Sequence, residues 1–174
     1  MGGGFFAYLQ RLEMLAFFSG YPLIYLFVQF IAGSPSLKNK TIRGFTSLLP
    51  SGYALVGTLY LGLQLRNLYP GFTLQNIEHA IPQPFLNIWG LLSILFWIPV
   101  ISKKPVLSML HSLVFFFIII GDLISQLTGV NSDRNILKND MRIYSVSILL
   151  NLAAFIFVAL ITFSLNFRKK KRKS

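Results

Sequence analysis

PVLSMLHSLVFFFIIIGDLISQL, residues 105–127, is the stretch that decides the fold of this chain. It contains two ionisable side chains, His111 and Asp122, and no lysine or arginine. A helix rises ~1.5 Å per residue and a bilayer core is ~30 Å thick, so this run is typical of a membrane-spanning helix. Four other stretches resemble it, and together they predict an all-α membrane protein.

The apolar stretches predict a bundle of about five transmembrane helices in a single domain, 1–174. The expected spans are residues 14–31, 48–65, 85–101, 106–127 and 143–165. Gly20 and Pro22 lie within the first span, so we expect a kink there. The short turn between the third and fourth spans makes these two helices antiparallel neighbours.

The composition agrees with a lipid-facing protein. Charged residues make up 12% of the 174 residues, against about a quarter in soluble domains. The chain has no cysteine, which excludes disulfides, zinc–thiolate sites and cysteine nucleophiles. Six of the sixteen basic residues lie in the tail 168–174, directly after the last apolar stretch. Such a tail is typical of a cytoplasmic anchor on anionic lipids, and we expect no nucleic-acid partner.

The charges also predict an orientation. With the basic tail in the cytoplasm, five spans place the N-terminus outside, and eleven of the sixteen basic residues fall on the cytoplasmic side. This satisfies the positive-inside rule. The absence of cysteine and the use of phenylalanine and lysine favour a bacterial inner membrane, and the alternative is a eukaryotic endoplasmic-reticulum protein with a basic retrieval tail. All five acidic residues fall on or near the outer side: Glu13, Glu78, Asp122, Asp133 and Asp140. Any polar site is therefore expected to face outward.

Two ionisable residues of the fourth span are candidates for function. His111 lies roughly 10 Å into the membrane and Asp122 roughly 27 Å, and about three helical turns separate them, so they share a face. Ionisable groups in lipid are costly and usually face inward or towards water. One interpretation is a proton- or ion-handling stripe. The other is that Asp122 reaches outer water and His111 makes one interhelical hydrogen bond.

Asn151 is the third polar candidate, near the middle of the last span. We expect its amide to hydrogen-bond to a neighbouring helix. If Asp122 lies inside the bundle, Asn151 or Tyr144 of the same span is its expected partner.

The second span carries small residues at helical spacing. Ala54, Thr58 and Gly62 form a small-xxx-small row, and Gly57 lies beside it. Such rows let two helix backbones approach closely, so we interpret this face as a packing surface.

Catalytic motifs are missing from the chain. It has neither the H-E-x-x-H of zinc proteases nor the G-x-S-x-G of serine hydrolases. Glu78 and His79, in the polar loop 66–84, are predicted to face water. With Asp122 they are the only basis for a membrane enzyme, and we expect no cofactor or metal.

These observations favour a non-enzymatic accessory or scaffold subunit of a membrane complex. Its expected partners are other membrane subunits or further copies of itself. The alternative is a small oligomeric transporter or channel with a polar path at His111, Asp122 and Asn151.

Overall fold

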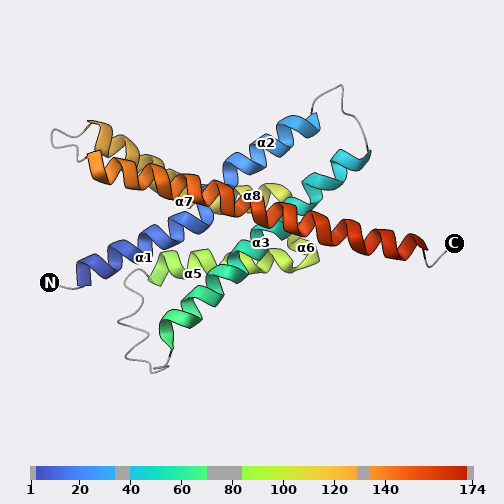
Figure 1. The fold of residues 1–174 in the computed structure, drawn as a ribbon, viewed down its shortest axis with the longest axis horizontal. Coiled ribbons are helices and arrows are strands. Elements are labelled where there is room, and N and C mark those ends of the chain that lie inside the picture. The colour runs from blue at the N-terminus through green and yellow to red at the C-terminus, as the bar shows by residue number, and fades with distance from the viewer. Residues whose placement is uncertain (1–2, 34–39, 70–83, 129–133, 172–174) are drawn as a thin grey trace.

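The computed structural model describes residues 3–33, 40–69, 84–128 and 134–171, and every element in these ranges is a helix (Figure 1). The longer helices are α1 (Gly3–Phe18), α2 (Tyr21–Gly33), α3 (Lys40–Leu68), α7 (Pro105–Thr128) and α8 (Arg134–Lys171). The shorter ones are α5 (Pro84–Leu92), η2 (Ser93–Trp97) and α6 (Pro99–Ser102).

Within the residues that the structure describes, four stretches are long and apolar enough to cross a membrane. They are Arg11–Ile31, Gly44–Asn67, Pro105–Thr128 and Lys138–Leu165. These stretches correspond to four of the five expected spans. The prediction of an all-α protein with several apolar helices that fit a membrane is therefore confirmed.

The expected kink in the first span is confirmed as a break between α1 and α2. Ser19 and Gly20 form a turn between the two helices. Pro22 follows in the first turn of α2, where its missing N–H leaves no helical hydrogen bond unmade. A Cβ on Gly20 would lie 2.5 Å from the backbone nitrogen of Ile148, so the break lies where α8 crosses.

The third expected span, residues 85–101, is not one continuous helix. It is divided into α5, η2 and α6, and its helical part Pro84–Trp97 is shorter than the four long spans. Ile98 is extended, with φ −71° and ψ 122°. The ring of Pro99 disfavours a helical conformation at the residue before it, which explains the interruption.

Two long helices continue beyond their apolar stretches. α3 begins at Lys40 and contains Pro50, whereas the apolar run suggested 48–65. α8 begins at Arg134, whereas the expected span began at residue 143. Backbone hydrogen bonds are satisfied within a helix, so a helix crossing the bilayer can extend into the surface region.

The helix ends gather at two opposite sides of the bundle (Figure 1). The starts of α1, α5 and α8 lie on one side with the ends of α3 and α7. The end of α2, the start of α3, the helix α6 and the end of α8 lie on the other. α5, η2 and α6 together run from the first of these sides to the second, after the first span and α3, and this run is called the third passage.

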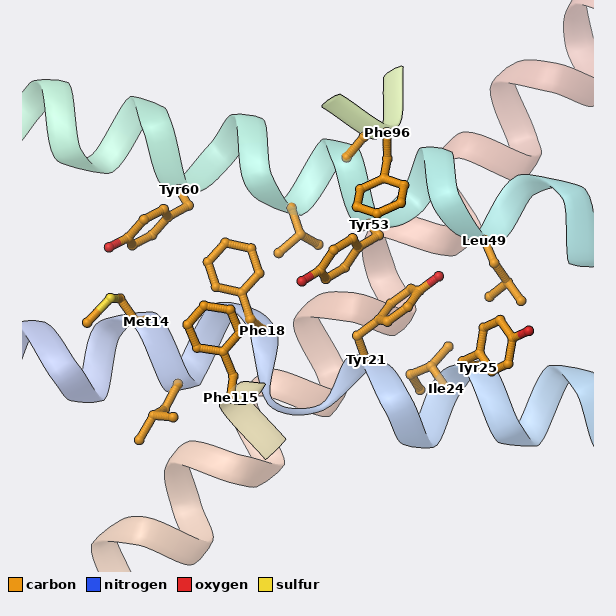
Figure 2. Packing of buried hydrophobic residues seen from close by; sticks show 14 of the residues in the cluster. Met14, Phe18, Tyr21, Ile24, Tyr25, Leu49, Tyr53, Tyr60, Phe96 and Phe115 are labelled. Atoms are coloured by element: carbon orange, nitrogen blue, oxygen red, sulfur yellow. The ribbon is translucent and has the colours of Figure 1, made fainter. Parts of the chain in front are cut away.

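Aromatic side chains make up about half of the residues in the core (Figure 2). Phe18 of α1 stacks on Phe115 of α7 with 4.8 Å between ring centroids. The Phe18 ring also contacts the rings of Tyr53 and Tyr60 of α3 in edge-to-face arrangements. Tyr21 of α2 packs on Tyr53, with 4.3 Å between the ring centroids. This cluster joins α1, α2, α3 and α7 at the level of the α1–α2 break.

Candidate functional site

Asp122 is paired with an arginine of another helix. Both terminal oxygens of its carboxylate accept hydrogen bonds from the Arg11 Nη2, each at 2.7 Å. The pair joins α1 to α7, and each side chain is about one third exposed. Asp140 of α8 is buried and interacts electrostatically with both Asp122 and Arg11. One cation therefore lies among two carboxylates where α1, α7 and α8 meet.

This arrangement predicts that Arg11→Leu destabilises the protein more than Asp122→Leu. Without Arg11, Asp122 and Asp140 repel each other with no cation between them. Without Asp122, Arg11 keeps Asp140 as a partner. Because the pair is partly exposed, we expect the two free energies of unfolding to differ by only about 1 kcal/mol. Thermal unfolding in detergent at low salt measures the difference, and equal losses would contradict it.

The His111 side chain is surrounded by aromatic rings. Its Nδ1 is 2.7 Å from the hydroxyl of Tyr53, and its ring stacks on Trp89 at 4.8 Å and an interplanar angle of 4°. Trp89 also donates its indole N–H to the backbone oxygen of His111, at 3.1 Å. Phe96 meets the histidine ring edge-on and Phe115 lies against it at a tilt. His111 thus connects α7 to α3, α5 and η2.

The Asn151 side chain satisfies a backbone carbonyl oxygen that the break in the first span leaves free. Its Nδ2 donates to the backbone oxygen of Phe17 at 2.7 Å, and also to the backbone oxygen of Ser147 at 2.8 Å. The Ser147 hydroxyl accepts a hydrogen bond from the Gly20 backbone N–H at 2.8 Å. A helix break in lipid frees backbone groups that water cannot reach. Here α8 hydrogen-bonds one freed carbonyl oxygen and one freed N–H. The expected hydrogen bond from Asn151 to a neighbouring helix is present.

The three residues predicted to line a polar path each contact a different part of the bundle. His111 is bonded to α3, Asp122 to α1, and Asn151 to the break at Phe17. No hydrogen bond joins any two of the three within the described parts of the chain. Asp122 has Arg11 as its partner rather than Asn151 or Tyr144, because α1 packs beside the C-terminal half of α7.

A further polar group lies between α1, α3 and α5. Glu13 is bonded to Asn67, and the hydroxyl of Tyr60 donates to the Asn87 side chain. Four buried side-chain atoms have no hydrogen-bond partner among the described residues: Glu13 Oε2, Gln64 Nε2, His111 Nε2 and Asn151 Oδ1. The sequence analysis did not single out Arg11, Asp140, Tyr53 or Trp89 as site residues.

No protein-family model, curated protein or solved structure matches this chain. In the described ranges, no three His, Cys, Asp or Glu side chains come together as a metal site. Glu78 and His79 lie outside the described residues.

The small residues of α3 divide between two environments. Ala54 is fully buried, and a Cβ on Gly57 would overlap the hydroxyl of Ser93. Thr58 accepts a hydrogen bond from the Trp97 indole at 2.9 Å. Gly62 is exposed, and a Cβ there would meet no described atom within 4 Å. The close approach expected along the whole row therefore covers Ala54 and Gly57 but does not reach Gly62.

Proposed function

We propose that this chain is a bacterial inner-membrane protein that acts as a non-enzymatic accessory or scaffold subunit. The supporting observation is the use of its polar side chains to join helices. Contacts of this kind among the described residues include Arg11–Asp122, Tyr21–Ser108, Tyr53–His111, Tyr60–Asn87 and Asn151–Phe17. Buried polar contacts of this kind hold helices in one arrangement, which a scaffold needs in order to present a constant surface.

The apolar surface of the bundle is where partner subunits would bind. Large exposed side chains recur along α8, including Leu149, Phe157 and Leu160. In a bilayer such residues contact either lipid or another transmembrane helix. We propose that one of these faces contacts a different membrane protein or a second copy of this chain.

Photo-crosslinking from single positions tests this proposal in native membranes. A photoreactive residue at Leu149 or Leu160 of α8, or at Phe117 of α7, samples different exposed faces, and buried Ile119 is the matched control. We expect one face to give a discrete protein adduct and the control position none. Recovery from mild detergent should then give a stoichiometric complex. Only lipid adducts at all exposed positions, together with an isolated monomer, would overturn the proposal.

We further propose that the N-terminus lies outside and the C-terminus in the cytoplasm. The side holding the end of α2 and the end of α8 carries most of the basic residues, in agreement with the positive-inside rule. The third passage is compatible with a full crossing despite its interruption. Its helical turns rise ~1.5 Å per residue in α5 and α6 and ~2.0 Å in η2, so residues 84–102 reach about 30 Å if collinear.

Reporter fusions should therefore place successive loops on alternate sides. A reporter inserted within 129–133 should be external, and one after Ser174 cytoplasmic. Insertions within 70–83 and after Lys103 test the third passage in the same way, and we expect external and cytoplasmic signals respectively. Same-side signals from the second pair would mean that residues 84–102 do not cross.

A transport function is the second candidate, and one observation favours it. Buried polar atoms of Glu13, Gln64, His111 and Asn151 have no hydrogen-bond partner in the described part of the chain. Buried polar groups without partners cost free energy unless a water or ligand satisfies them. Proton and cation flux in liposomes would be compared for the wild type, His111→Ala and Asp122→Asn. Unchanged flux in both variants would remove these residues as carriers.

A further inference from the structure

An apolar groove opens on the side of the bundle that carries most of the basic residues. It has a volume of about 250 Å³ and lies between α2, α3 and α8. It is lined by Phe27, Val28, Ile31, Phe45, Leu152 and Phe155. In Figure 1, α2 and the start of α3 diverge from the second half of α8.

The size and lining of the groove restrict what fills it. An apolar cavity of ~150 Å³ already holds a benzene-sized molecule, so this space has room for part of a hydrocarbon chain. All six lining side chains are apolar, so they cannot orient a polar ligand. Left empty, the lining would lose dispersion contacts on one side. Within a bilayer, the acyl chain of a lipid is the ligand with this chemistry.

The charge at the mouth of the groove indicates which lipid. Phe45 of the lining contacts Phe163 of α8, with 5.6 Å between ring centroids. Arg43 precedes Phe45 by two residues in α3, and exposed Arg168 follows Phe163 by five residues in α8. No acidic residue occurs in 14–77, so none lies near this mouth on α2 or α3. Cationic residues at the membrane surface attract anionic headgroups.

We propose that this groove binds one acyl chain of an anionic phospholipid, whose headgroup lies between the start of α3 and the end of α8. The lipid joins the α2–α3 hairpin to α8 where these helices diverge. This site is distinct from the polar contacts of the opposite side and does not depend on the identity of any partner subunit.

Native mass spectrometry of the full chain in mild detergent tests the proposal. We expect the wild type to retain one phosphatidylglycerol or another anionic phospholipid. Leu152→Trp places a larger side chain in the groove and should weaken retention by about tenfold or more, since each buried methylene contributes roughly fourfold in affinity. Leu110→Trp is the matched control, because Leu110 is exposed on α7 and does not line the groove.

Equal retention in the two tryptophan variants would overturn the site and leave only non-specific surface lipid. Melting temperature and size-exclusion profile establish that both variants fold. Arg43→Gln with Arg168→Gln tests the headgroup, and we expect roughly fivefold weaker binding of anionic lipid for each arginine removed. If the double variant keeps the wild-type preference for anionic lipid over phosphatidylcholine, the proposed position of the headgroup is overturned.

A second measurement uses the wild-type chain alone. Phosphatidylglycerol with a photoreactive acyl chain, in vesicles otherwise of phosphatidylcholine, should crosslink to peptides containing Phe27–Ile31, Phe45 and Leu152–Phe155. Crosslinks spread evenly over α7 and α8 would contradict a specific groove.

Discussion

Replacing Gly20 with alanine is expected to unfold the bundle, although the change adds one methyl group. A Cβ at this position would lie 2.5 Å from the backbone nitrogen of Ile148 and 2.6 Å from the backbone carbonyl carbon of Ser147. These atoms belong to the main chain of α8, so no change of rotamer removes the overlap. The first span and α8 would have to separate, at a cost of at least about 3 kcal/mol in the free energy of unfolding.

Gly121→Ala is the matched control for this prediction. A Cβ on Gly121 would meet no described atom within 4 Å, and alanine favours a helix over glycine by ~0.5–1 kcal/mol. We therefore expect Gly121→Ala to melt at or above the wild-type temperature in detergent, while Gly20→Ala gives little folded protein. If Gly20→Ala melts at the wild-type temperature, the first span and α8 must cross at a greater distance than the structure shows.

The second large effect is expected for Gly57→Leu. A Cβ on Gly57 would overlap the Ser93 hydroxyl and lie 3.0 Å from Ser93 Cβ and 3.3 Å from the backbone nitrogen of Ile94. Ser93 is fully buried, and its hydroxyl donates to the Gly90 backbone oxygen at 2.5 Å, so it has little room to turn away. The substitution should push η2 from α3 and reduce the free energy of unfolding by about 2–3 kcal/mol.

Gly62→Leu separates this packing effect from a general intolerance of leucine in α3. Gly62 is exposed, so a leucine there should contact lipid and leave the melting temperature close to that of the wild type. A smaller pair of changes, Gly57→Ala with Ser93→Gly, should recover part of the stability lost by Gly57→Ala alone. Similar losses for Gly57→Leu and Gly62→Leu would contradict the contact with Ser93.

The position of most helices follows from local chemistry that can be read in the sequence. Long runs with few charges predict helices because only an internally bonded backbone is stable in lipid. Gly20 and Pro22 similarly predict the break in the first span. Pro99 carries the same signal for the third span, because it keeps Ile98 out of the helical conformation. The helices also extend past their apolar runs, since charged residues such as Arg134 and Lys40 remain helical at the membrane surface.

The contacts between helices were much less predictable. Asp122 and Arg11 are 111 residues apart, and no periodic pattern in either helix indicates that α1 packs beside α7. The sequence did place both residues at the same side of the membrane, and that shared depth was the one available signal for the pair. The small-residue row indicated a packing face on α3, but spacing alone could not show that η2 contacts it near Gly57 and leaves Gly62 exposed.

The break between α1 and α2 also constrains the order of assembly during synthesis. The first span leaves the ribosome early, but Ser147, which bonds the Gly20 N–H, follows 127 residues later. A backbone group without a partner in hydrocarbon costs several kcal/mol. Until α8 inserts, the broken first span carries that cost, and a chain truncated before α8 lacks the Ser147 and Asn151 side chains that satisfy the break. A membrane protease thus has a physical basis for distinguishing truncated chains from those that have reached α8.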